Sequence, residues 1–305
     1  MTQAVRPAPA TAAGAGRPWA VRLSAALYAR PRLRLAGLLS APTAWLLVAY
    51  LGSLAVMFTA AFWSVDSFTG ALVREFTLDN LRTLATEEVY RTIALRTLGI
   101  AVAVTLLDVV IAVPMAFYMA KVARPRARIF LVVAVLTPLW ASYLVKVYAW
   151  RGLLADNGIV ADVLRPFGLD TPGYGVPAVI ITLAYLWLPY MILPIYAGLD
   201  RLPDSLLEAS GDLGAGAWRT FRSVVLPLTF PAIVAGSIFT FALSLGDYIT
   251  VKIVGGATQM VGNVIYDNIG VAGNLPFAAA AAFFPVVVIV AYLVAVRRTG
   301  ALDNL

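Results

Sequence analysis

The 305-residue sequence contains no cysteine and no histidine. The absence of cysteine excludes disulfides and thiol nucleophiles, and the absence of both residues excludes most zinc sites and histidine acid–base chemistry. A Gly-x-x-x-x-Gly-Lys-Ser/Thr sequence, which would hold nucleotide phosphates, is also missing. We therefore expect no catalytic residue, no metal site, no cofactor and no ATP hydrolysis in this chain.

Charged residues make up only 13% of the sequence, whereas 61% of its residues are hydrophobic. Soluble domains are about half apolar and a quarter charged, so the composition indicates an all-α integral membrane protein. The net charge of +7 at pH 7 agrees better with lysine and arginine retained on the cytoplasmic side than with nucleic-acid binding. We expect contact with a lipid bilayer and none with nucleic acid.

Six apolar stretches are long enough to cross a bilayer, which requires ~20 helical residues. The first apolar run has no charge between Arg34 and Asp66, over 31 residues, which is too long for a cleaved signal peptide. Prolines interrupt several of the stretches, among them Pro114 and Pro138. We predict spanning helices at roughly 39–63, 96–119, 129–150, 178–199, 231–249 and 277–296.

The basic residues fall mainly on one side of these spans. The N-terminus, the turn at 121–128, the loop at 200–228 and the C-terminus carry 15 of the 23 lysines and arginines, and the other three loops carry 6. The positive-inside rule therefore places both termini in the cytoplasm. We divide the chain into a disordered basic cytoplasmic N-terminus (1–34), a first transmembrane helix with an outer loop (35–93), a permease domain (94–297) and a cytoplasmic tail (298–305).

The loop at 200–228 carries the most distinctive pattern. Ser205 and Glu208 have the spacing of a capping box, with Pro203 at the edge of the helix start. Gly214 and Gly216 allow a left-handed stop and a sharp turn. A second short helix is predicted from Trp218 to Val225, ended by Pro227. The net charge of the loop is close to zero, so we expect it to bind a protein partner rather than anionic lipid.

A family resemblance follows from this loop. Glu208-Ala209-Ser210 is followed by Gly214 and, nine residues later, by Val224-Val225-Leu226-Pro227. The pattern resembles the EAA loop of ABC-importer permeases, with Ser210 in place of alanine and Val224 in place of isoleucine. The resemblance implies that the loop inserts into a cleft on a cytoplasmic ATPase, whereas the alternative is an ordinary connector between two helices. The coupling residues are then Glu208, Ala209, Asp212, Gly214, Arg219, Phe221, Leu226 and Pro227.

The resemblance extends over about residues 77–296. Leu139 to Trp150 is similar to the third span of spermidine/putrescine-type permeases, and Leu186 to Tyr196 is similar to the fourth. It implies a type I ABC importer permease fold with six transmembrane helices in the bacterial inner membrane, and the role of first permease subunit. It also implies a second homologous permease, two cytoplasmic ABC ATPases that hold ATP and Mg²⁺, and a periplasmic substrate-binding protein.

Ionisable and aromatic residues in or near the spans are candidates for the substrate path. A charge inside a span is costly and should face the bundle interior or water. Asp108 and Asp247 could meet a cation, and aromatic rings could bind an ammonium group. Alternatively, Asp108 bonds a neighbouring helix, Asp247 is an exposed helix-end carboxylate, and the rings only pack. The candidate path consists of Asp108, Trp140, Tyr143, Trp187, Tyr190, Asp247 and Tyr248.

The sequence thus favours a permease subunit of an ATP-driven importer for a small organic cation. The resemblance favours spermidine, putrescine or a related solute as the substrate. A stand-alone secondary transporter or channel that works as a homo-oligomer is the alternative. An intramembrane enzyme fits poorly, because no paired aspartates, Ser/Lys pair or metal-binding set lies at matching depth in the spans.

Overall fold

The computed structural model describes residues 31–66 and 68–298. Disorder was expected for residues 1–34: residues 1–30 lie outside the described residues, whereas residues 31–34 form the start of a helix, so the prediction of disorder there was wrong. Of the expected tail at 298–305, residues 299–305 lie outside the described residues. The chain divides into two compact units, which meet between Met57 and Phe58. Among the described residues, five helices are long and apolar enough to cross a membrane, or six if one bent pair counts as a single span. The expected all-helical membrane fold is confirmed.

The first unit contains one long helix. It consists of α2 (Pro31–Leu46), the π-helix η1 (Leu47–Leu51) and α3 (Gly52–Ala60), whose last residues belong to the second unit. Residues Leu35–Ala60 form the apolar span. These 26 residues exceed the ~20 that cross a bilayer. The span therefore begins and ends a few residues before the predicted 39–63.

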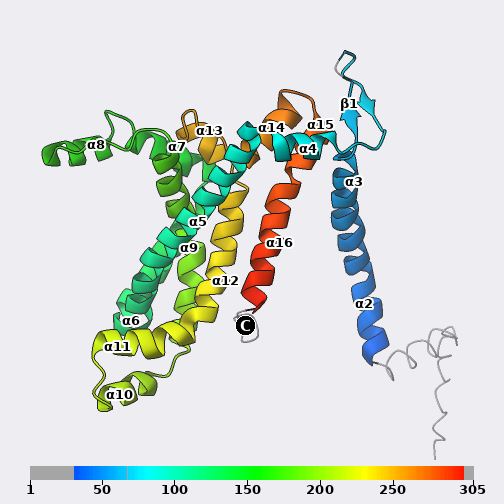
Figure 1. Ribbon diagram of the computed structural model, residues 1–305. Helices are drawn as coiled ribbons and strands as arrows, with labels where there is room; N and C mark the ends of the chain where they lie inside the picture. The colour runs from blue at the N-terminus through cyan, green and yellow to red at the C-terminus, as the bar shows by residue number, and fades with distance from the viewer. Residues whose placement is uncertain (1–30, 67, 299–305) are drawn as a thin grey trace, which may run out of the picture. The chain divides into compact units, whose positions relative to one another are not determined.

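Three long helices form the centre of the second unit: α5 (Glu88–Phe117), α9 (Val176–Asp200) and α12 (Leu226–Leu245) (Figure 1). Small residues bring α9 and α12 together. A Cβ atom added at Gly236 would lie 3.1 Å from the Cα of Met191, and one added at Gly198 would lie 2.7 Å from the Cβ of Ala232. Close backbone approach at glycine and alanine is typical of helix packing in membranes.

The predicted third span at 129–150 is not one continuous helix. It is divided into α6 (Pro125–Trp140) and α7 (Tyr143–Leu153), whose axes differ by 98°. Ala141 and Ser142 have extended backbones, with ψ values of 142° and 135°. Pro138 lacks an N–H for the last turn of α6, and the Tyr143 side chain bonds residues beyond α12. The prediction of an unbroken span was therefore wrong, because these tertiary contacts fix α7 in another direction.

The remaining elements join the spans. Helix α4 begins at Asp79, and Ser64 pairs with Val73 in an antiparallel hairpin. Figure 1 shows α4, α13, α14 and α15 at one end of the second unit, and α10 and α11 at the other. The connecting elements and last span are β1 (Ser64–Val65), β2 (Leu72–Val73), α4 (Asp79–Thr86), η2 (Tyr118–Val122), α8 (Ile159–Leu164), η3 (Arg165–Phe167), α13 (Ile249–Val254), α14 (Val261–Gly270), α15 (Leu275–Ala281) and α16 (Phe283–Arg298).

Candidate functional site

The loop between α9 and α12 protrudes from one end of the bundle (Figure 1). Its first helix, α10, covers Asp204–Asp212 and follows Pro203 directly. Pro203 is extended, and no side chain caps the helix. Ser205 therefore lies inside the first turn, and the predicted capping box with Glu208 is wrong. Because Pro203 takes the N-cap position, Ser205 is the second residue of the helix and cannot cap it.

The turn after α10 depends on Gly214. This glycine has φ = 78°, in the left-handed region that residues with a Cβ atom avoid. Its N–H donates to the Gly211 carbonyl at 2.8 Å, and the Ala215 N–H donates to the Ser210 carbonyl at 3.1 Å. The predicted left-handed stop is confirmed at Gly214. Gly216 has an ordinary φ of −68° and precedes the next helix.

The serine that departs from the family pattern has a partner across this turn. Ser210 Oγ lies 2.9 Å from Thr220 Oγ1 and joins α10 to α11 (Ala217–Thr220). The alanine found in the family pattern could not make this bond. Sequence reasoning missed the pair, because a separation of ten residues across a turn has no recognisable periodicity.

The second helix of the loop does not end at Pro227. Helix α11 continues through the π-helix η4 (Phe221–Val225) into α12, so that Ala217–Leu245 is one apolar span of 29 residues. Pro227 lies in the first turn of α12, and the wide π turn before it changes the hydrogen-bond pattern that the proline would otherwise break. The predictions that Pro227 closes the helix and that the fifth span starts near Pro231 were therefore wrong.

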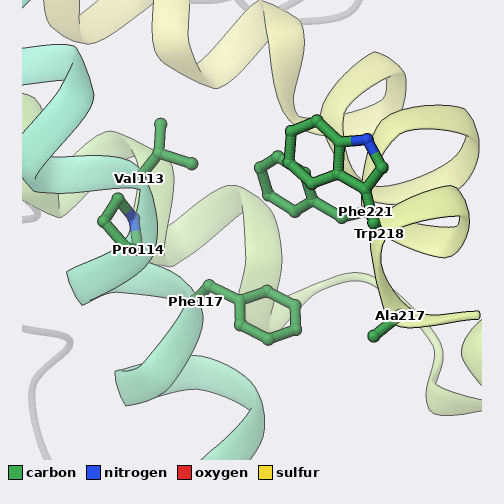
Figure 2. A pocket seen from close by; sticks show the side chains of 6 residues that line it. All are labelled: Val113, Pro114, Phe117, Ala217, Trp218 and Phe221. Atoms are coloured by element: carbon green, nitrogen blue, oxygen red, sulfur yellow. The ribbon is translucent and has the colours of Figure 1, made fainter.

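Aromatic side chains connect the loop to α5. Trp218 stacks on Phe221 with their ring centres 5.7 Å apart, and Phe221 meets Phe117 of α5 edge to face at 6.5 Å. Figure 2 shows these rings around an apolar pocket between α5 and α11. Its volume is about 520 Å³, and its lining consists of Val113, Pro114, Phe117, Ala217, Trp218 and Phe221. The loop is therefore in direct contact with the end of α5.

A lysine joins the start of the loop to the same end of α5. The Nζ atom of Lys121, in η2, donates to the Leu202 carbonyl at 2.6 Å and to Asp204 Oδ1 at 2.7 Å. This ammonium group holds the pKa of Asp204 below its usual value. Arg128 makes a similar link to Asp200 at 3.1 Å. From the sequence, these two basic residues were used only to assign the orientation of the chain. The acidic residues of the adjacent loop on the same side could have predicted these ion pairs.

The outer surface of the loop combines exposed apolar and charged side chains. Leu213 is 88% exposed, and Leu206 and Trp218 are exposed as well. Among the described residues, Glu208, Asp212 and Arg219 form no ion pair. An exposed apolar patch with charges around it is typical of a protein interface. The other predicted coupling residues, apart from half-buried Phe221, are also exposed: Ala209, Gly214, Leu226 and Pro227.

Four of the predicted path residues form a chain of contacts, which begins at Asp247 just after α12 and continues along α9 through Trp187 and Tyr190. Asp247 is 8% exposed and accepts hydrogen bonds from the Tyr143 hydroxyl and, at 2.8 Å, from the Thr250 N–H. Tyr143 stacks with Trp187 at 5.9 Å, and Trp187 contacts Tyr190 at 6.0 Å. The alternative of Asp247 as an exposed carboxylate is therefore wrong.

The other path residues lie elsewhere. Asp108 is fully buried in α5, and neither of its carboxylate oxygens has a hydrogen-bond partner among the described residues. The alternative of a bond from Asp108 to a neighbouring helix thus has no support. Trp140 is 89% exposed at the end of α6. Tyr248 stacks on Tyr266 instead of joining the Tyr143 chain. A substrate role for any of these residues stays a prediction.

Comparisons with known proteins agree with this architecture. The family described as "Binding-protein-dependent transport system inner membrane component" matches residues 102–298. The inner membrane ABC transporter permease protein YdcU of Escherichia coli (strain K12) is 43% identical over 95% of this chain and 97% of its own. The spermidine/putrescine transport system permease protein PotB of the same organism is 32% identical over 75% of this chain and 84% of its own.

Solved structures show the same fold. A chain of a bacterial ABC transporter involved in import of the acidic polysaccharide alginate has a TM-score of 0.64 at 18% identity, over 91% of this chain and 98% of its own. A chain of the MetNI methionine ABC transporter has a TM-score of 0.54 at 18% identity, over 73% and 97%.

These matches decide the class of the protein. It is a multi-pass protein of the inner membrane. Permease subunits of this kind are not enzymes and carry no cofactor, because the nucleotide binds the partner ATPase. The chain belongs to the binding-protein-dependent transport system inner membrane component family, as a permease subunit of an ABC importer.

Proposed function

We propose that this permease forms part of the path for a small organic cation, spermidine, putrescine or a related solute. It acts as the first of two homologous permease subunits and pairs with the second. Two cytoplasmic ATPases drive the complex, the loop of residues 204–227 docks into a cleft on one of them, and a periplasmic binding protein delivers the substrate. The observation that carries the docking assignment is the exposed surface of this loop, with unpaired Glu208, Asp212 and Arg219 around Leu213.

The contacts of the loop suggest how force enters the bundle. When the ATPases close on ATP, they push on α10 and α11. The Phe221–Phe117 contact and the bonds of Lys121 pass this displacement to α5, and the continuous helix from Ala217 to Leu245 carries it to the other end. A tilt of both helices would then expose the path alternately to the two sides of the membrane.

The orientation follows from charge. The end that carries α10 and α11 also carries the basic residues of η2 and the start of α6, together with Arg297 and Arg298 at the end of α16. The positive-inside rule places this end in the cytoplasm. The six arginines that precede the first span place the N-terminus on the same side of the membrane. Residues 35–93 then contribute the first span and an outer loop, 94–297 the permease domain, and 298–305 a cytoplasmic tail.

Two observations support a cationic cargo. PotB, which is named for spermidine and putrescine, is one relative of this chain. The buried Asp247 carboxylate and the rings of Tyr143, Trp187 and Tyr190 are groups that attract an ammonium ion. The remaining candidates for the path are Asp108, Trp140 and Tyr248.

Copurification tests the docking assignment. The chain, expressed with its neighbouring transport genes and extracted in mild detergent, should retain an ATPase subunit and a second permease. Replacement of the tip residues Glu208 and Leu213 by alanine should release the ATPase and leave the permease pair intact. A stand-alone homo-oligomer that transports the substrate without any ATPase would contradict the proposal.

A further inference from the structure

Lys252 of α13 lies in a cluster of groups that suits an alkylammonium ion. Its Nζ atom is 3.9 Å from the centre of the Tyr266 ring and 2.6 Å from Asp267 Oδ1, both on α14. The Tyr248 ring stacks on Tyr266, with their centres 4.7 Å apart and their planes 22° from parallel. The ammonium group thus has an aromatic face on one side and a carboxylate within hydrogen-bond distance.

These two contacts are those that recognise a primary ammonium ion in general. The ring face attracts the positive charge through its quadrupole. The carboxylate accepts a short, charge-assisted hydrogen bond from one of the three N–H groups. A neutral hydroxyl of the same size would gain only an uncharged hydrogen bond to the carboxylate, and an anion would gain neither contact.

We propose that the cluster of Tyr248, Tyr266 and Asp267 is a binding site for the primary ammonium end of the transported solute, and that Lys252 occupies it in the absence of that solute. The inference rests on the proposed function and extends it to a residue-level site for the substrate. Lys252 then acts as a tethered competitor, which leaves when the ammonium group of the ligand arrives.

The walls of the cluster are held by bonds that do not involve the Lys252 side chain. The Tyr248 carbonyl accepts a bond from Asn263 Nδ2 at 3.1 Å, and the Val261 N–H at the start of α14 donates to Thr97 Oγ1 at 2.9 Å. Removal of the lysine ammonium would therefore leave the rings and carboxylate in position. A preformed site of this kind binds with little ordering cost.

The cluster also lies next to the buried carboxylate of the candidate path. Tyr248 follows Asp247 in the chain, and a Cβ atom added at Gly262 of α14 would lie 2.9 Å from the Asp247 carbonyl oxygen. Helix α14 thus packs directly against the backbone of Asp247. A cation that left the cluster would find the next acidic group within the same group of helices.

Exchange at this site is feasible because the occupant is weakly held. The side chains of Lys252 and Asp267 are each 38% exposed, so water reaches both. Ion pairs and cation–π contacts at exposed positions are individually weak. The competing interpretation is a structural ion pair in which Lys252 only fastens α13 to α14 and is never displaced.

The small number of lysines makes a direct test possible on the unaltered chain. Lys121, Lys146 and Lys252 are the three lysines of the sequence. Reductive dimethylation with ¹³C-formaldehyde keeps their charge and gives each an NMR methyl signal. The signal of Lys252, assigned by its loss in Lys252→Arg, should be shifted upfield by the Tyr266 ring current, and Tyr266→Leu should abolish that shift.

Putrescine and 1,4-butanediol then form a matched pair of probes for the protein in nanodiscs. Millimolar putrescine should move the Lys252 signal to the position of free dimethyllysine, whereas butanediol at the same concentration and ionic strength should leave it unchanged. A Lys252 signal that stays upfield at saturating putrescine, or that moves equally with butanediol, would overturn the site. The result is independent of ATPase copurification, so the site and the docking assignment can fail separately.

Discussion

At the scale of single residues, the backbone of Gly214 sets the geometry of the loop between α9 and α12. A side chain at its φ of 78° costs about 1–2 kcal/mol. We expect Gly214→Asp to insert into the membrane at normal levels but to retain several-fold less ATPase on copurification, with a matching loss of uptake.

Gly216 provides the matched control for this variant. Its φ is −68°, it is the residue before α11, and a Cβ atom there meets nothing within 4 Å. Aspartate is favoured at such a helix start, so Gly216→Asp should behave almost as the wild type. Equal uptake by the two variants would show that the left-handed turn does not matter for coupling.

Lys121 joins α5 to the loop through one nearly buried side chain. In Lys121→Met the buried Leu202 carbonyl loses its partner, which costs about 1–3 kcal/mol. We expect transport per ATP hydrolysed to fall several-fold while the complex still assembles. Arg126→Met, which removes an exposed charge from the same basic turn, should leave this ratio unchanged.

The ion pair of Lys121 with Asp204 should not make coupling depend on pH near neutrality. The lysine lowers the pKa of Asp204 below its usual value. Any stabilisation from the pair is therefore complete above the unfolded pKa of about 3.9 and is lost only as the pH falls through the lower folded value. The ratio of wild-type to Lys121→Met activity should be the same at every pH from 5.5 to 8. A ratio that falls towards pH 5.5 would contradict this assignment.

At the scale of elements, the close approach of α9 and α12 depends on Gly236. A Cβ atom there would lie 2.9 Å from Met191 Sδ and 3.1 Å from the Met191 Cα. Overpacking of this kind costs about 1–3 kcal/mol. We expect Gly236→Ala to lower the thermal unfolding midpoint of the detergent-solubilised chain by several degrees.

Gly99 of α5 is the control, because a Cβ atom there meets nothing within 4 Å. Both substitutions gain the same helix propensity from alanine, so their difference isolates the steric contact. If Gly236→Ala proved as stable as Gly99→Ala, the two helices would not be packed at van der Waals distance at this point.

The elements also show what the sequence could and could not predict. Bilayer thickness fixes the length of a span, so apolar runs were sufficient to locate the first, fourth and sixth spans to within a few residues. The left-handed turn was predictable because only glycine tolerates it freely. The 98° bend after Trp140, the continuation of the helix through Pro227 and the Ser210–Thr220 bond depend on contacts between distant segments. Local propensity contains no information about such contacts.

At the scale of the whole molecule, the absence of cysteine makes the orientation directly measurable. An introduced cysteine is the unique thiol of the chain. Leu213 lies in the coupling loop, and Val271, which is 82% exposed, follows α14 near the opposite end of the second unit (Figure 1). In spheroplasts, an impermeant maleimide should label Val271→Cys rapidly and Leu213→Cys only after lysis. The reverse pattern would place the coupling loop outside the cell.

The unbroken helix from Ala217 to Leu245 connects the two ends of the bundle mechanically. Its 29 residues span roughly 44 Å at 1.5 Å per residue. As a lever of this length, it converts a tilt of about 5° at one end into roughly 4 Å of travel at the other, two residues before Asp247. Linkage between two binding events is reciprocal. A bound cation that opposes this movement of the helix should therefore affect the nucleotide sites of the ATPases. Occupancy of the substrate site should then change the affinity for ATP.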